Sequence, residues 1–199
     1  MGAFFGITAG ISPGPLLALV ITETLKYNRK AGIRIALAPL ITDLPIILIT
    51  YFIFSKLSQY DIILSIISLS GGIFFFYLGY ETLKTKGPEL TATGKQPESL
   101  KKGITANLLN PHPYLFWLTV GIPTAFKAYE TNLVTVILYF LLFYTMLVGS
   151  KIGIAFLAER SKSFLSNKSC KITMHILAAA LFIFAAIFLY DGIETLIHE

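Results

Sequence analysis

The chain has 199 residues, of which 55% are hydrophobic and 14% are charged, and its formal net charge at pH 7 is +5. Together with a mean hydropathy of +0.72, this composition excludes an ordinary soluble domain, in which about 25% of the residues are charged. The positive charge lies mainly in loops between apolar stretches, so it gives no support to a nucleic-acid partner. The sequence therefore predicts a protein of the lipid bilayer.

Six apolar stretches follow one another along the chain, and each has about the 20 residues that a membrane-spanning helix needs. They occupy residues 3–25, 33–54, 62–83, 103–126, 133–158 and 173–197. A transmembrane β-barrel is excluded because it needs alternating segments of about 10 residues. No basic region precedes the first stretch and no small-X-small cleavage site follows it, which favours a retained helix over a signal peptide. The predicted fold is an all-α membrane protein with six transmembrane helices.

The first stretch contains a glycine-rich half followed by a break. Glycines recur there every four residues, at Gly2, Gly6, Gly10 and Gly14. This spacing places them on one helix face, where another backbone can approach closely. Pro13 and Pro15 then remove two backbone donors from the helix. The carbonyls four residues earlier, those of Ala9 and Ile11, must therefore line a polar cavity or find another partner.

Ionisable residues stand in the middle of the second and fifth stretches. Asp43 follows Pro39 by one turn, and Lys151 lies between two glycines. Because an insertion scale assigns a central Asp or Lys about +2.5 to +3.5 kcal/mol, each needs a reason to be there. Two interpretations stay open. One is a static ion pair that only fixes packing; the other is an Asp43 that takes a proton or the substrate's amino group while Lys151 balances its charge in one state of the cycle.

The fourth stretch repeats the first. Residues 6–17 read GITAGISPGPLL and residues 103–115 read GITANLLNPHPYL, so both begin with Gly-Ile-Thr-Ala and reach Pro-X-Pro near the middle. Around Pro111 and Pro113 stand the polar residues Asn107, Asn110 and His112. Prolines that break helices at matching positions of two repeats point to a transporter binding site, with structural kinks as the competing interpretation. We interpret His112 as a hydrogen-bonding residue rather than a proton relay.

A second repeat closes each half of the chain. Residues 77–83 read YLGYETL and residues 190–196 read YDGIETL. With three helices in each half, the second copy enters the membrane from the opposite side, so the repeats are predicted to be inverted. We predict a single transmembrane transporter domain over residues 1–199, made of repeat one at 1–84, a cytoplasmic linker at 85–102 and repeat two at 103–199.

Basic residues alternate between loops and predict the orientation of the helices. The loops after the first, third and fifth stretches hold four, five and four Lys or Arg residues, whereas the two intervening loops hold one each. By the positive-inside rule the three basic loops are cytoplasmic and both termini are outside. Glu23 and Glu81 stand at cytoplasmic helix ends. They are expected to be solvated or to pair with Lys26 and Lys84.

Several of these motifs occur together at a defined spacing. They are Pro13-Gly14-Pro15, the mid-helix Asp43, Tyr77-Leu78-Gly79, Gly103, the run Asn107-Leu108-Leu109-Asn110-Pro111 and the Phe116 that follows it. In a chain of this length the combination resembles the LysE/RhtB amino-acid exporters over most of its residues. The resemblance implies an inner-membrane protein that exports amino acids or related metabolites, driven by the proton gradient, with a homodimer as the candidate assembly. The chain departs from the usual pattern at His112-Pro113, where a Lys commonly follows Asn-Pro, and at Pro39, in a region usually rich in Gly.

We therefore expect a secondary transporter of the plasma membrane, which is the inner membrane of a Gram-negative cell, that exports amino acids or related small metabolites by alternating access as an antiporter. Its predicted substrate-binding residues are Pro13, Gly14, Pro15, Asn107, Asn110, Pro111 and His112. Asp43 and Lys151 are the predicted proton-coupling residues or ion pair. The expected partners are the small-molecule substrate, the bilayer and a second copy of the chain, and no cofactor is expected.

Two other classes of protein remain as alternatives. A membrane enzyme would need a nucleophile with a base, and Ser12 with His112 is the pair that the repeats bring together, but a serine followed directly by proline with no acidic partner argues against it. A cation or metal-ion exporter or channel of a related inverted-repeat fold would use Asp43. Against a metal, no second acidic residue stands in the middle of a stretch, and Cys170 is alone, without a Cys or His cluster.

Overall fold

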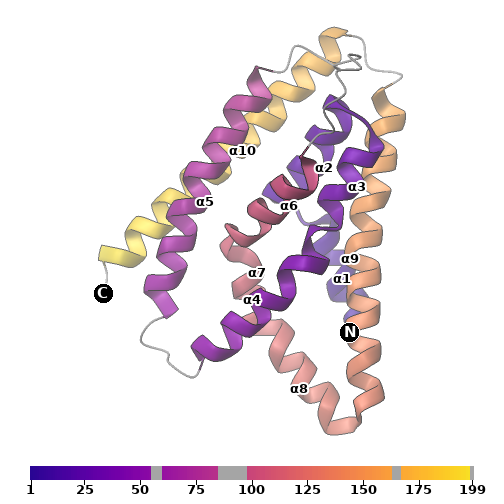
Figure 1. Cartoon of the computed structure of the whole chain (residues 1–199), viewed down its shortest axis with the longest axis vertical. Helices are drawn as coiled ribbons and strands as arrows, with labels where there is room; N and C mark the ends of the chain where they lie inside the picture. The colour runs from indigo at the N-terminus through magenta and orange to yellow at the C-terminus, as the bar shows by residue number, and fades with distance from the viewer. Residues whose placement is uncertain (55–59, 85–97, 163–166, 198–199) are drawn as a thin grey trace.

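The computed structural model describes residues 1–54, 60–84, 98–162 and 167–197, and every regular element among them is helical (Figure 1). The first half contains α1 (Gly2–Ile11), α2 (Pro15–Lys26), α3 (Arg29–Ala36), α4 (Ala38–Phe54) and α5 (Tyr60–Leu83). The second half contains α6 (Ser99–Leu108), α7 (Pro111–Phe116), η2 (Trp117–Gly121), α8 (Ile122–Thr131), α9 (Leu133–Lys162) and α10 (Asn167–Ile197). The predicted all-α fold is confirmed for this part of the chain.

The first stretch is interrupted where its prolines predict. α1 ends at Ile11 and α2 begins at Pro15, and the two helices meet at an angle of 60°. Pro15 occupies the first helical position of α2, where an N–H would have no intrahelical partner, and Gly14 precedes it as the N-cap. The second stretch has a single-residue interruption at Leu37, between the end of α3 at Ala36 and the start of α4 at Ala38, but residues 29–52 still form one candidate span.

The fourth stretch is divided into four short elements. α6 ends at Leu108, and α7 begins at Pro111 with Asn110 as its N-cap. The five π-helical residues of η2 then join α7 to α8, and such wide turns often occur at functional sites. α6 begins at Ser99, so the end of the predicted linker is helical, while residues 85–97 lie outside the described residues.

In the part of the chain that the structure describes, four segments are long and apolar enough to cross a membrane, at residues 29–52, 65–83, 133–161 and 171–195. The bent pair α1 and α2 gives a fifth if it is counted as one span. The predicted number of six is therefore not confirmed, because each piece of the fourth stretch is shorter than a bilayer. Large apolar side chains such as Phe4, Leu44 and Leu157 are exposed, as expected for surfaces that face lipid.

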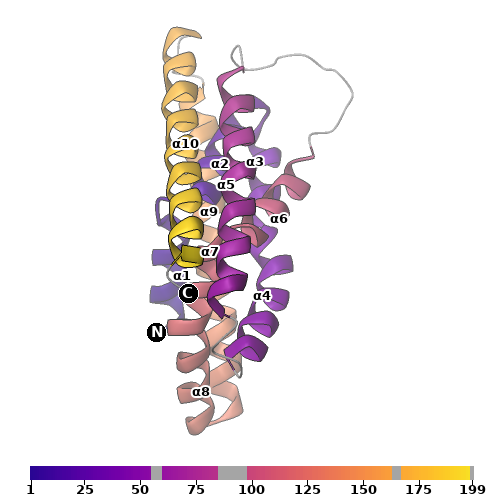
Figure 2. The same cartoon turned by 90° about the vertical axis from the view of Figure 1, so that its left-hand side faces the viewer.

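Two pairs of helices pack side by side, α5 with α10 and the short α1 with part of α9 (Figures 1 and 2). Gly2, Gly6 and Gly10 face α9, and a Cβ added to Gly10 would lie only 2.7 Å from the Ser150 Cβ. The predicted glycine interface is confirmed for these three residues. It is wrong for Gly14, because α1 ends before this residue and a Cβ added there would meet only the Ser12 carbonyl oxygen, at 3.9 Å.

The helix ends that flank the three basic loops lie together. Figure 1 shows the turn from α2 to α3, the end of α5 and the loop-side ends of α9 and α10 in its upper half. The two chain termini lie in the lower half of the same view. This arrangement is the one that the alternating loop charges require, and the outside location of the termini stays a prediction.

Candidate functional site

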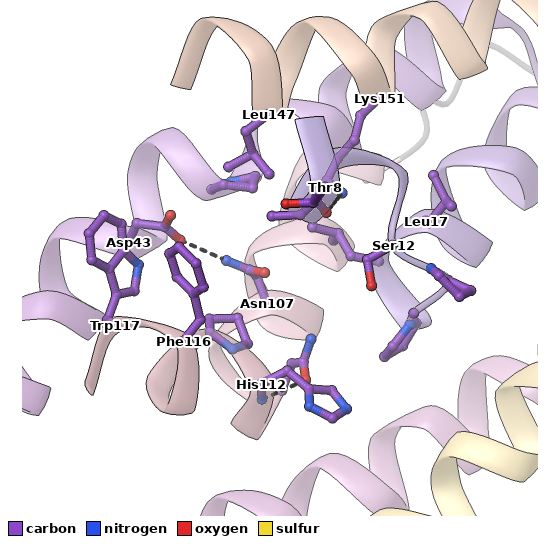
Figure 3. A pocket seen from close by; sticks show the side chains of 18 of the residues that line it. Thr8, Ser12, Leu17, Asp43, Asn107, His112, Phe116, Trp117, Leu147 and Lys151 are labelled. Atoms are coloured by element: carbon purple, nitrogen blue, oxygen red, sulfur yellow. Dashed lines mark hydrogen bonds between the residues drawn. The ribbon is translucent and has the colours of Figure 1, made fainter. Parts of the chain in front are cut away.

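A cavity of about 450 Å³ lies where the two broken stretches meet (Figure 3). Its walls come from the α1–α2 break, from α4, from the α6–α7 break with η2, and from α9. The lining includes most of the predicted site residues, namely Pro13, Gly14, Pro15, Asp43, Asn107, Asn110, His112 and Lys151. Pro111 is buried as the first residue of α7 and does not line the cavity. The volume is in the range of small-molecule sites.

Lys151 fills the first break. Its ammonium group donates hydrogen bonds to the backbone carbonyl oxygens of Ala9 at 3.2 Å and Gly10 at 3.0 Å. The Ala9 carbonyl is the one whose normal donor is replaced by Pro13. These oxygens also form the negative end of the α1 dipole, which a cation stabilises. The side chain is 4% exposed, so Lys151 acts as a buried cap for the end of α1.

The other side of this break presents the start of α2 to the cavity. Gly14 has an extended backbone and provides no side-chain cap, and Pro15 has no N–H. The backbone N–H groups of Leu16 and Leu17 therefore have no partner within the helix, and both residues line the cavity. Together with the helix dipole they favour a negative group at this position.

Asp43 projects from α4 into the opposite side of the cavity. The side-chain amide of Asn107 donates to the Asp43 Oδ1 at 3.2 Å and to the Thr42 hydroxyl at 2.6 Å. Trp117 and Tyr144 are further hydrogen-bonding groups beside this carboxylate. Asp43 is only 4% exposed. Because a buried carboxylate is costly unless it accepts hydrogen bonds, these neutral donors are what hold it there.

The charged groups of Asp43 and Lys151 share the cavity without touching. Figure 3 shows Asp43 beside Trp117 and Asn107, and Lys151 approaching from another side near Thr8. Among the described residues no salt bridge joins Asp43 to Lys151. The two charges therefore act on each other through space, across a volume that a small molecule can enter.

The second break is held by its own side chains. The Asn110 Oδ1 accepts a hydrogen bond from the His112 backbone N–H at 3.0 Å and so caps α7. The Tyr114 hydroxyl donates to the Leu108 carbonyl oxygen at 3.0 Å, at the end of α6. The His112 ring packs edge-on against Phe188, with 5.5 Å between ring centroids. In the part of the chain that the structure describes, no hydrogen bond joins His112 to Ser12, the pair that an enzyme would need.

An aromatic wall lies behind the polar residues and was not predicted from the sequence. Phe116, Trp117 and Phe143 all line the cavity, and the rings of Phe116 and Phe143 stack 5.4 Å apart. Leu147 continues this wall. Two signals in the sequence could have drawn attention to this wall: Phe116 belongs to the motif set around Asn110-Pro111, and Trp117 is the single tryptophan of the chain.

A second polar feature, here called the charge cluster, joins α2, α5 and α6 and consists of Glu23, Lys26, Glu81, Ser99 and Lys102. Lys102 donates to Glu81 at 2.6 Å and to Glu23 at 3.3 Å, and Lys26 donates to Glu81 at 3.1 Å. The Ser99 hydroxyl donates to Glu23 at 2.6 Å. Glu23 is 2% exposed, so the expectation that it is solvated or paired along its own helix is wrong. Its partners come from α6, which sequence spacing does not reveal.

Lys102 is the centre of the charge cluster and directly precedes the fourth apolar stretch, residues 103–126. Burial alone would lower the pKa of its ammonium group, but the carboxylates of Glu23 and Glu81 hold this pKa above its ordinary value. Lys102 therefore stays charged at neutral pH.

In the described ranges, no group of three or more His, Cys, Asp or Glu side chains could hold a metal ion.

Comparison with models of protein families identifies a match. A family model described as LysE type translocator matches residues 7–192, which include the cavity, both helix breaks and the charge cluster. Neither the curated proteins nor the solved structures contain a significant match to the chain.

Proposed function

The chain belongs to the LysE-type translocator family, and from this premise we propose that it exports amino acids or related small metabolites through the cavity between its helix breaks. The family is one of transporters and not of enzymes, and the chain is a multi-pass membrane protein. One observation carries the finer proposal: the cavity brings together a carboxylate, an ammonium group and two proline-broken helix ends. These groups suit a small zwitterion.

We propose that the substrate's ammonium group binds on the Asp43 side. The Asp43 carboxylate and the amide oxygen of Asn107, which Figure 3 shows turned away from Asp43, are the acceptors there. The substrate's carboxylate would lie against the start of α2, where the N–H groups of Leu16 and Leu17 and the helix dipole favour an anion. In this arrangement Pro13, Gly14 and Pro15 contribute by exposing backbone rather than through their side chains.

We further propose that transport proceeds by alternating access and that the charge cluster is the closure on the side of the basic loops. Glu23 is eight residues beyond Pro15, about 12 Å along α2 at 1.5 Å per residue. The charge cluster thus lies between the cavity and that side. A substrate entering from the cytoplasm would require the contacts of Lys102 with Glu23 and Glu81 to separate.

The remaining parts of the proposal follow the sequence and the family. The protein would work in the plasma membrane as a proton-coupled antiporter, with two inverted repeats, cytoplasmic basic loops and both termini outside. Asp43 would carry the proton, since it is the one carboxylate in the described lining of the cavity. A homodimer is part of the proposal, and the mass of the purified protein in detergent would test it.

Transport by purified full-length protein in proteoliposomes tests the proposed function. With an imposed proton gradient, we expect movement of labelled amino acids and no movement of divalent metal ions. Asp43→Asn should abolish the response to the proton gradient, because the amide can still accept the Asn107 hydrogen bond but cannot ionise. Glu130→Gln, at an exposed position of α8 outside the cavity lining, is the control for removing a carboxylate and should transport normally. Movement of metal ions alone would favour a cation exporter, and an unchanged gradient response in Asp43→Asn would remove Asp43 from the mechanism.

A further inference from the structure

The fixed charges of the cavity sum to zero. Among its described lining residues Asp43 is the one acid and Lys151 the one Lys or Arg side chain. His112 adds an imidazole on a surface-exposed turn of α7, where it contacts Phe188. A bound molecule with equal positive and negative charge leaves this balance unchanged, whereas a molecule with net charge adds an unmatched charge in a low-dielectric region.

Both charged side chains are already engaged. Lys151 gives two of its three protons to the carbonyls of Ala9 and Gly10, and Asp43 accepts from Asn107 while Trp117 and Tyr144 lie beside it. Each can match one opposite charge of a ligand across the cavity, but neither has the capacity for two. A substrate side chain with its own ammonium or carboxylate group would therefore find no counter-charge.

The wall available to a substrate side chain is apolar. It is formed by Leu17 on α2, Phe116 on α7 and by Phe143 and Leu147 on α9. Figure 3 shows Leu147 and Phe116 on the side of the cavity toward Asp43, with Leu17 on the far side beyond Ser12. Apolar groups that fill such a wall gain free energy from burial, whereas a charged group there loses its hydration without a partner.

We propose that this cavity selects amino acids with zero net charge and an apolar side chain, and that it rejects dibasic and dicarboxylic amino acids. The inference rests on the proposed function, because it assumes that an amino acid is the substrate. It goes further by naming the class of amino acid. Leucine and phenylalanine represent the favoured class, lysine and glutamate the rejected ones.

Exchange across proteoliposomes tests this selectivity without an assumption about coupling. Vesicles that contain the full-length protein and unlabelled leucine are diluted into labelled leucine, and each competing amino acid is added outside. Phenylalanine should compete about as well as leucine, and lysine and glutamate more than about tenfold more weakly, because each carries one unmatched charge. Lysine or glutamate competing as well as leucine would overturn the selectivity, whereas a complete absence of exchange with any amino acid would overturn the proposed function itself.

A charge added to the cavity should change the preference in a defined direction. Ser12 lines the cavity at the exposed break after α1, so it tolerates a polar substitution of similar size. Ser12→Asp supplies a second carboxylate and should improve competition by lysine by about tenfold or more, with glutamate still excluded. Ser12→Asn has nearly the same shape without the charge and should keep the wild-type order. An equal effect of both substitutions would show that shape rather than charge sets the preference, and would overturn the proposal. If Ser12→Asp does not reach the membrane, the order in which amino acids compete in the unmodified protein tests the proposed selectivity by itself.

Discussion

The charge cluster makes a prediction that can be tested with two adjacent lysines. Lys102 contacts the carboxylates of both Glu23 and Glu81, and its side chain is 22% exposed while that of Glu23 is 3% exposed. Lys101 pairs with Glu98 at 3.6 Å, and both side chains are more than 70% exposed, at 76% and 72%. The same substitution, Lys to Met, therefore removes a partly buried ion pair at one position and a solvated pair at the next.

The two substitutions should differ strongly in stability. Removing one partner of a buried pair leaves an uncompensated charge and costs about 3–5 kcal/mol. Lys102→Met should cost about 3 kcal/mol, at the lower end of this range, because Glu23 still accepts from the Ser99 hydroxyl and Glu81 still pairs with Lys26. An exposed pair is worth about 0–1 kcal/mol, so Lys101→Met should be close to neutral. A change of 1 kcal/mol shifts the unfolding midpoint by roughly 2–4 °C for a protein of this size. The midpoint should therefore fall by about 6 °C or more in Lys102→Met and by less than about 4 °C in Lys101→Met.

Thermal unfolding of the purified proteins in one detergent measures this difference. The double variant Glu23→Gln with Lys102→Met should regain part of the loss, because the amide needs no counter-charge. Equal midpoints for the Lys101 and Lys102 variants would refute the reasoning, since they would mean that Glu23 is not desolvated. A double variant less stable than Lys102→Met alone would refute the assignment of the loss to the unpaired carboxylate.

Three further predictions follow from the fold and the cavity. Gly10→Ala should lower the free energy of unfolding by about 1–3 kcal/mol, because the added Cβ would lie 2.7 Å from the Ser150 Cβ. The control Gly153→Ala adds a Cβ that meets no atom within 4 Å, so thermal unfolding should show no change or a gain of up to about 1 kcal/mol. A thiol at Gly14, in a cysteine-free background, should react with a small water-soluble reagent and be protected by substrate. A thiol at the exposed Leu44, beside Asp43 on α4 and so at the depth of the cavity, should stay unreactive because it faces lipid. A reporter active only outside the cytoplasm should work when fused after Glu199; activity of a cytoplasmic reporter there would contradict the orientation.

The helix breaks and the polar residues beside them could be predicted from the sequence because they depend on local rules. Pro13 and Pro15 remove donors wherever they occur in a helix, and Asn110 before Pro111 is a good N-cap followed by a residue suited to the first helical turn. The repeat then places the two breaks at equivalent points. These arguments need only neighbours in the chain, and the structure has α2 and α7 beginning at Pro15 and Pro111.

Contacts between distant segments could not be predicted in this way. Glu23 was expected to be solvated or to pair along its own helix, but its partners Ser99 and Lys102 are more than 70 residues away. The sequence pattern does not show that α6 begins at Ser99, four residues before the fourth apolar stretch, and so brings Lys102 to α2. The division of the fourth stretch was likewise underestimated, because its hydropathy is continuous while Pro111, Pro113 and the π-helical turn interrupt the helix.

The contacts of Lys151 and Asp43 bear on how such a site can change state. A buried salt bridge resists separation, because removing either partner leaves a charge without compensation. Here each charge is stabilised instead by neutral dipoles, Lys151 by the Ala9 and Gly10 carbonyls and Asp43 by the Asn107 amide. Protonation of Asp43 would therefore not leave Lys151 without partners, and binding of a zwitterion would not require an ion pair to be broken first. In the proposed cycle this lets Asp43 exchange a proton or the substrate's ammonium group while Lys151 continues to hold the end of α1, so that the break keeps its shape as the charge beside it changes.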